Sequence, residues 1–269
     1  MTLSSTRPPM CDNTESSVII TGGTQGLGLA VARALIASGC TKITLAGRSA
    51  DKGAKACAAL LELGVDAYYV QADMSSPDDC ADLFNAAVTR FGFVNGLVNS
   101  AAITDRGSLT DTTLEMWQMH MDLNLRGPFL MMQALARHLI ETEKTGSMVN
   151  ILSTSAYVGQ SFLTPYATSK GGLLTLTKNA ANAMRKNRIR VNAVAPGWME
   201  TEGEADIQRR FHGGGEDWAE KAAASTPMGQ LVDPDELSPL IAYLLSPSSG
   251  LITGAIINYD QQIIGAVPE

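Results

Sequence analysis

Residues 17–28 read SVIITGGTQGLG, and residues 29–39 continue as LAVARALIASG. The first part is a short apolar run typical of a buried strand, and the second has the apolar spacing of a helix. The glycines between them permit a tight turn and let backbone N–H groups reach an anion at the helix N-terminus. This stretch therefore predicts a strand, a phosphate-binding turn and a helix; a tight turn made only for packing is the alternative.

The rest of the chain repeats this alternation of strand and helix. Further strands are predicted at residues 42–46, 67–71, 96–99, 147–152, 190–195 and 255–259. Helices are predicted between them, three with capping signals: Ser76-Pro77, Thr112 with Glu115, and Asp233-Pro234. The pattern predicts a doubly wound α/β (Rossmann) fold in one domain, with a seven-stranded parallel sheet flanked by helices on both faces.

Two segments depart from the alternation, and one proline is out of place. Residues 1–16 are polar and contain prolines, so we expect a flexible tail before a single domain at 17–269. Residues 197–227 are longer than an ordinary connection in such a fold and are predicted to form a mobile lid. Pro239 lies inside the last helix, which it should kink or shorten.

Composition excludes several classes of protein. The net charge of -7 and pI of about 5.0 would repel phosphate backbones, so we expect no nucleic-acid partner. No apolar run approaches the roughly 20 residues that a spanning helix needs, so we expect no membrane partner. The four cysteines lie far apart without histidines at ligand spacing, which predicts reduced thiols and no metal site. These features together are typical of a cytoplasmic protein.

The end of the second predicted strand bears on the cofactor. Residues 45–49 read LAGRS, with no carboxylate before Asp51. An acidic side chain here would bind the ribose 2′-hydroxyl of NAD, whereas an arginine accommodates the 2′-phosphate of NADP. Arg48, with Ser49 as a hydrogen-bonding neighbour, therefore favours NADP(H), and NAD(H) stays the alternative.

A tyrosine and a lysine four residues apart carry the predicted chemistry. Tyr166 and Lys170 lie at i and i+4 in a helical pattern, so both project from one face. A tyrosine with a pKa of about 10 is a poor base unless a cation stabilises its phenolate. We expect Lys170, together with the cationic nicotinamide ring of the oxidised cofactor, to lower the pKa of Tyr166.

The T-G-x-x-x-G-x-G spacing of residues 21–28, with Y-x-x-x-K at 166–170, resembles the short-chain dehydrogenase/reductase family over about residues 16–265. The resemblance implies an NAD(P)-dependent oxidoreductase acting on CH–OH or C=O groups. It makes Ser153, thirteen residues before Tyr166, the catalytic serine, with Ser155 as the near alternative. It also makes Asn124, within a long helix, the residue that anchors a water of a proton relay.

The resemblance implies a cofactor site as well: Gly22, Thr24, Gln25, Gly26, Leu27, Gly28, Arg48, Ser49, Asp73, Met74, Asn99, Ala101, Tyr166, Lys170, Pro196, Gly197, Met199 and Thr201. Three departures from the family pattern stand out. Thr24 and Gln25 occupy the place where NADP-preferring members often carry a basic residue. Residues 99–102 read NSAA for Asn-Asn-Ala-Gly, and residues 260–262 read DQQ for Asp-Gly-Gly.

The substrate is predicted to be a small polar molecule such as a sugar, polyol or hydroxy acid. Its expected contacts are Ser153, Ser155, Phe162, Tyr166 and Trp198, with Tyr157, Met199, Glu200, Arg209, Arg210 and His212 as further candidates. The resemblance also implies a homo-oligomer, a dimer or tetramer, built through the helices beginning near Thr112 and Pro165. An NAD-dependent sugar or polyol dehydrogenase is the alternative within the family, and a non-catalytic sensor of nicotinamide cofactor is the alternative outside it.

Overall fold

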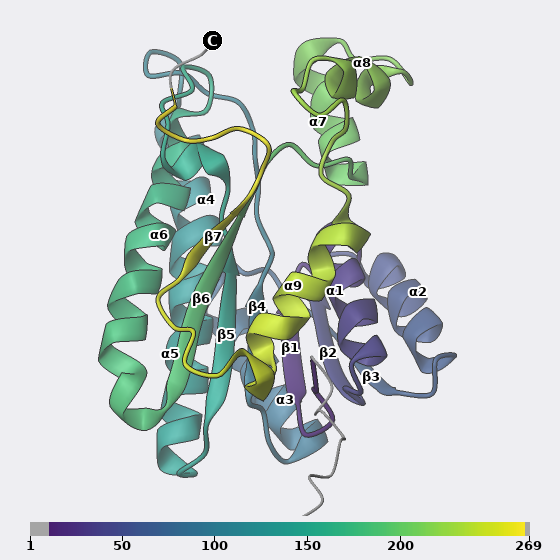
Figure 1. The fold of residues 1–269 in the computed structure, drawn as a ribbon, viewed down its shortest axis with the longest axis vertical. Helices are drawn as coiled ribbons and strands as arrows, with labels where there is room; N and C mark the ends of the chain where they lie inside the picture. The colour runs from purple at the N-terminus through teal and green to yellow at the C-terminus, as the bar shows by residue number, and fades with distance from the viewer. Residues whose placement is uncertain (1–10, 267–269) are drawn as a thin grey trace, which may run out of the picture.

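The computed structural model describes residues 11–266, in which one parallel sheet has the strand order β3-β2-β1-β4-β5-β6-β7 (Figure 1). The strands are β1 (Ser17–Thr21), β2 (Lys42–Gly47), β3 (Asp66–Gln71), β4 (Gly96–Asn99), β5 (Gly146–Ile151), β6 (Ile189–Pro196) and β7 (Ile256–Tyr259). Every predicted strand is present, with each end within one residue of its predicted place. The predicted fold class is confirmed.

Helices cover both faces of the sheet. They are α1 (Gly26–Ala37), α2 (Ala50–Leu61), α3 (Pro77–Phe91), α4 (Leu114–Met121), α5 (Gly127–Glu141), α6 (Thr164–Met184), α7 (Glu202–His212), α8 (Trp218–Ala224) and α9 (Pro234–Leu245). One apolar core joins the sheet to α1, α2 and α9, and a second joins it to α3, α5 and α6. The strand order reverses between β1 and β4, where open α/β sheets form a crevice at the carboxyl ends of their strands.

The start of the described chain is not loose. Asn13 is fully buried, and its side-chain amide donates to the Ala242 carbonyl at 3.1 Å and to the Ser38 hydroxyl at 2.8 Å. The Asp12 amide donates to the Ser246 hydroxyl at 3.1 Å. The predicted tail therefore does not extend through residues 11–16, because these hydrogen bonds tie it to α1 and α9; residues 1–10 lie outside the described part.

The long helix predicted around Asn124 is interrupted. Residues 122–126 form a π-helical turn between α4 and α5, and Asn124 lies within it. Helix α4 begins after Thr113, whose side chain accepts from the Met116 amide. The predicted cap, Thr112, instead donates its hydroxyl to the Ser108 carbonyl at 2.6 Å. Single π turns are frequent at functional sites, and this one sets the direction of the Asn124 side chain.

Pro239 neither ends nor shortens α9, which is continuous from Pro234 to Leu245. A proline at this place has no N–H to donate to the Asp235 carbonyl four residues earlier. The Ser238 hydroxyl donates to that carbonyl instead, at 3.3 Å. The segment predicted as a lid, residues 197–227, contains the two helices α7 and α8, which lie above the carboxyl ends of the strands in Figure 1. Its mobility stays a prediction.

Candidate active site

A cavity of about 1280 Å³ opens at the carboxyl edge of the sheet. Its walls come from the glycine turn, the ends of β2, β4, β5 and β6, the start of α6, and α7. Most of the predicted site residues line it: Gly22, Thr24, Gln25, Gly26, Leu27, Gly28, Arg48, Ser49, Met74, Ala101, Ser153, Ser155, Phe162, Tyr166, Lys170, Gly197, Trp198, Met199 and Thr201. The topology therefore gathers residues from the whole length of the chain at one edge.

The glycine turn is closely packed and leaves the first amides of α1 without a side-chain cap from residues 11–266. A Cβ on Gly28 would lie 2.3 Å from the Gly22 carbonyl oxygen, and a Cβ on Gly22 would lie 2.9 Å from the Ala101 backbone. Gly22 also has a φ of +66°, which side chains rarely adopt. Helix α1 follows with Gln25 at its N-cap, and no described side chain caps its first amides. These free N–H groups and the helix dipole favour an anion at this point.

The polar groups beyond β2 form one cluster. Arg48 and Ser49 are exposed at the cavity, and the Ser49 side chain caps α2 by accepting from the Lys52 amide at 3.3 Å. The Lys52 ammonium contacts the Gln25 side chain and pairs with Glu202 at 3.2 Å. Sequence reasoning missed Lys52, which lines the cavity with Arg48 and is paired with Glu202. Its place in the first turn of α2, four residues after Arg48, was the available signal.

Tyr166, Lys170 and Ser153 meet at one wall of the cavity. Tyr166 and Lys170 both project from the first turns of α6, and the Lys170 ammonium lies 5.8 Å from the centre of the tyrosine ring. The same ammonium donates to the Ile151 carbonyl at 2.7 Å, at the end of β5. Ser153 comes two residues later and contacts the Tyr166 hydroxyl. Strand β5 thus places both the lysine's acceptor and the serine next to the tyrosine.

Burial shifts the pKa values of both Tyr166 and Lys170 in the protein alone. Burial raises the pKa of Tyr166 to about 12, although the Ser153 contact opposes this shift. Burial also lowers the pKa of Lys170 to about 8. For the protein groups alone, desolvation of the phenolate outweighs its neighbours. The lowering of the Tyr166 pKa expected with the cationic nicotinamide ring in place stays a prediction. Tyr166 is protonated at neutral pH and can act as a proton donor.

Asn124 links the two sides of the catalytic wall. It is fully buried, and its carbonyl oxygen accepts from the Ile103 amide at 2.9 Å. Its amide group donates to the Ile103 carbonyl at 3.0 Å and to the Ser169 hydroxyl at 3.1 Å. The side chain thus fastens the loop after β4 to α6 beside Lys170. Both amide hydrogens have protein partners, so a water held by this side chain would have to donate to its oxygen.

Three predicted cofactor contacts do not line the cavity: Asp73, Asn99 and Pro196. Asp73 accepts from the amide and hydroxyl of Ser75, which shapes the turn after β3. The buried Asn99 amide donates to Asn150 at 2.8 Å, and the Asn99 oxygen has no partner among the described residues. Thr201 lines the cavity and also caps α7 by accepting from the Glu204 amide at 3.1 Å.

The altered segment at residues 260–262 has a contact of its own. The Gln261 side chain accepts from the Met228 amide at 2.6 Å and donates to the Gln230 carbonyl at 2.7 Å. It therefore ties the end of the chain to the loop after α8. Asp260 lines the cavity and packs against Gly197, where an added Cβ would lie 2.2 Å from the Asp260 carboxylate.

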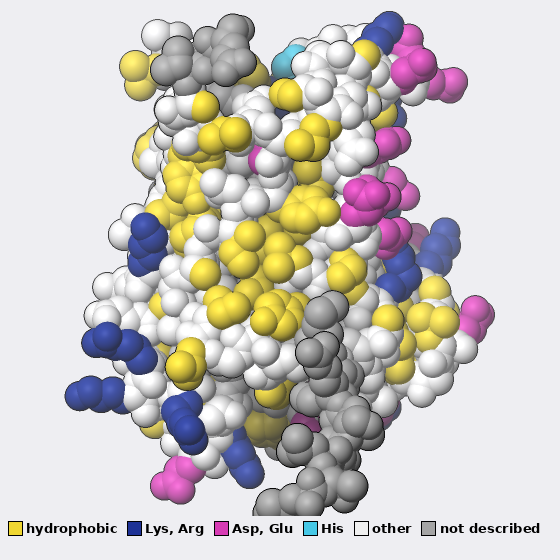
Figure 2. Space-filling view, in the orientation of Figure 1, with side chains coloured by type: hydrophobic (Ala, Val, Ile, Leu, Met, Phe, Trp, Pro, Cys, Tyr) yellow, Lys and Arg dark blue, Asp and Glu magenta, His cyan; other side chains and the backbone are white. Residues whose placement is uncertain are grey.

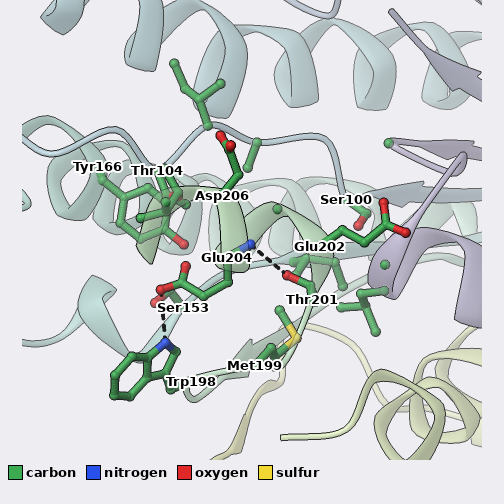
Figure 3. Close-up of a pocket in the computed structure, with 18 of the residues that line it drawn as sticks. Ser100, Thr104, Ser153, Tyr166, Trp198, Met199, Thr201, Glu202, Glu204 and Asp206 are labelled. Atoms are coloured by element: carbon green, nitrogen blue, oxygen red, sulfur yellow. Dashed lines mark hydrogen bonds between the residues drawn. The ribbon is translucent and has the colours of Figure 1, made fainter. Parts of the chain in front are cut away.

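The substrate side combines aromatic and charged groups. Ser155 is buried and donates to the Gln160 side chain at 2.7 Å, whereas Phe162 and Trp198 are 44% and 42% exposed at the cavity mouth. Arg106 and Glu204, which sequence reasoning did not single out, form an ion pair between the loop after β4 and α7. Figure 3 shows the Glu204 carboxylate in the same space as Ser153, Tyr166 and Trp198.

The chain resembles known proteins throughout this region. Residues 22–261 match the family model described as enoyl-(acyl carrier protein) reductase. The chain is 33% identical to an L-rhamnose 1-dehydrogenase (NAD(P)(+)) of Azotobacter vinelandii, over 91% of this chain and 95% of that one. It is also 33% identical to an NADP-dependent (R)-specific alcohol dehydrogenase of Lentilactobacillus kefiri, over 91% and 96%.

Among solved structures, a variant of actinorhodin polyketide ketoreductase with NADPH superposes with a TM-score of 0.85 at 30% identity, covering 92% of this chain and 97% of that one. The fold, the family model and the curated relatives agree with the predicted resemblance. This chain belongs to the short-chain dehydrogenase/reductase family, the NAD(P)-dependent oxidoreductases that act on CH–OH and C=O groups.

Proposed function

We propose that this protein transfers a hydride reversibly between NADP(H) and the carbonyl or secondary alcohol carbon of a small polar substrate. The observation that carries the proposal is the meeting of Ser153, Tyr166 and Lys170 at the wall of a cavity that also contains the glycine turn. Hydride transfer to a carbonyl leaves charge on its oxygen, and a proton donor at that oxygen is the chemistry that this wall offers.

Each residue of the wall has a distinct role in the proposal. When bound, the nicotinamide group supplies or accepts the hydride. Tyr166, with a pKa of about 12, donates its proton to the substrate oxygen during reduction. The Ser153 hydroxyl binds the same oxygen and orients it, since it already contacts the tyrosine. The Lys170 ammonium holds positive charge where the phenolate develops. Asn124 positions α6 by its bond to Ser169.

The preference for NADP(H) rests on the cluster beyond β2. Arg48 and Lys52 both line the cavity, with the Ser49 hydroxyl between them in sequence, and Glu202 at 3.2 Å from Lys52 offsets one of the two positive charges. A phosphate binds such a cluster through charge-assisted hydrogen bonds, whereas a ribose hydroxyl needs an acidic acceptor. Comparison of kcat/KM for NADPH and NADH tests this assignment: we expect NADPH to be favoured at least about tenfold, and equal values or a preference for NADH contradict it.

We also propose that the protein is a cytoplasmic homo-oligomer, a dimer or tetramer, in which residues 197–227 form a lid. No helix in the described part of the chain is long and apolar enough to span a membrane. Strand β7 is the last strand of the sheet, and Figure 2 shows apolar side chains gathered over β7 and α9. Exposed apolar side chains on α4 and α5, such as Leu114, Met119 and Phe129, offer a second surface.

A spectrophotometric screen tests the proposed reaction. Carbonyl compounds and secondary alcohols, including sugars and polyols, are offered with each cofactor, and absorbance of the reduced nicotinamide is followed. We expect turnover of at least one polar carbonyl–alcohol pair in both directions. Tight binding of cofactor with no turnover across the whole panel would instead favour the non-catalytic sensor.

A further inference from the structure

Glu204 is a carboxylate held at the substrate side of the cavity. It lies on α7, and its side chain is only 15% exposed. One carboxylate oxygen, Oε1, accepts from the Trp198 indole at 3.0 Å and from the Gln208 amide at 2.7 Å. Arg106 approaches the same oxygen at 3.4 Å. Three donors from three segments therefore fix the direction of this carboxylate.

The second oxygen of Glu204 is left for a ligand. No described residue donates to Oε2, and the residue lines the cavity. Figure 3 shows the carboxylate between the Trp198 indole and the Tyr166 hydroxyl, near Ser153. A fixed carboxylate oxygen without a protein donor is a strong acceptor for a substrate hydroxyl.

Arg106 compensates the charge of Glu204. Its side chain is also 15% exposed and is held by the Thr104 carbonyl at 2.9 Å and the His212 ring at 3.2 Å. Its guanidinium lies 5.7 Å from the centre of the Phe162 ring. The pair is locally neutral, so it offers an acceptor and a donor for hydroxyl groups without a net field that would attract a free carboxylate or phosphate.

We propose that Glu204 and Arg106 form a binding subsite for a hydroxyl on the carbon next to the reacting one, and that the substrates are neutral α-hydroxy ketones and vicinal diols, as in sugars and polyols. The inference rests on the proposed function and gives its substrate class. With the reacting oxygen at Tyr166 and Ser153, the neighbouring hydroxyl donates to Glu204 Oε2 and accepts from Arg106. Trp198 and Phe162 provide the apolar faces that border it.

A second role for the ion pair predicts a different result. Glu204 and Arg106 also connect α7 to the loop after β4, as do Arg210 and Asp105 at 2.8 Å. If the pair only holds α7 in place, its loss lowers turnover of every substrate by a common factor. A hydroxyl-binding subsite affects only substrates that carry the second hydroxyl.

The test compares two ketones that differ by one hydroxyl group, acetoin and butanone, with NADPH. We expect kcat/KM of the wild type to favour acetoin by about 10- to 100-fold, the range for one hydrogen bond to a charged group. Glu204→Gln keeps the shape and removes the charge. It should bring this ratio close to one by lowering acetoin turnover, with butanone turnover within about threefold of the wild type.

Two variants serve as controls. Glu220→Gln removes an exposed carboxylate on α8, outside the cavity, and should leave both values unchanged. Lys221→Gln breaks an ion pair of the same segment, 2.7 Å from Asp217 and outside the cavity, and should change both values by one factor. The inference is overturned if the wild type shows no preference for acetoin over butanone. This measurement does not depend on the folding of any variant. An equal loss of both activities in Glu204→Gln overturns it as well. Failure of the proposed function is distinct, since it appears as no turnover of any carbonyl compound in the screen.

Discussion

Replacing Lys170 with methionine should stabilise the fold at pH 7 while it removes turnover. Burial lowers the pKa of Lys170 from the ordinary value of 10.5 to about 8, so the charged form costs the folded state about 3 kcal/mol at pH 7. The methionine variant also loses the hydrogen bond to the Ile151 carbonyl, which reduces its gain in stability by about 1 kcal/mol. We expect the free energy of unfolding to rise by about 2 kcal/mol.

The pH dependence of this difference gives a sharper test. The folded-state pKa of Lys170 is depressed, so the neutral lysine costs the fold nothing above pH 10.5. Stability is lost as pH falls through about 8, because the buried side chain must then take up a proton. The advantage of Lys170→Met should therefore shrink by roughly 2 kcal/mol between pH 7 and pH 10. Urea unfolding at both pH values measures it, with Lys178→Met, an exposed position on the same helix, as the control. A variant that is less stable than the wild type at pH 7, or a gap that does not change with pH, refutes the reasoning.

Two further predictions concern the cofactor turn and the proton donor. Gly28→Ala places a Cβ 2.3 Å from the Gly22 carbonyl oxygen, so a fluorescence titration should show NADPH binding weakened at least about tenfold. Gly159→Ala, where an added Cβ meets nothing within 4 Å, should bind NADPH normally. Tight binding of NADPH by Gly28→Ala would show that the turn is not the phosphate site. The kcat/KM for ketone reduction should fall as pH rises through about 8, because Lys170 loses its proton there while Tyr166 stays protonated to about 12. A kcat/KM that does not change up to pH 10 argues against a role for the lysine charge.

The sequence predicted those features that depend on local order along the chain. The seven strands are short apolar runs between helical segments, so residues 17–21 and their counterparts were found within one residue. The glycine turn was predicted to bind phosphate because it lies between the first strand and the first helix, β1 and α1. Tyr166 and Lys170 share a face because they are four residues apart in α6, and no tertiary information was needed to see this.

Features that arise from tertiary contacts were missed. Arg106 and Glu204 are 98 residues apart and become neighbours only when α7 folds over the loop after β4. The π turn that contains Asn124 has no signature of its own in the residue pattern. The rise that burial gives the pKa of Tyr166 in the protein alone was not predicted, because the depth of burial is a property of the packed fold.

Replacing Tyr166 with phenylalanine tests the central claim most directly, because it removes one oxygen atom from the half-buried catalytic wall and leaves the ring in place. NADPH binding and ketone reduction are measured on the same preparation of each protein. The account predicts that turnover falls at least about 100-fold, as expected for loss of a general acid, while the Kd for NADPH stays within about threefold of the wild type. Reduction at an undiminished rate by Tyr166→Phe would contradict the account.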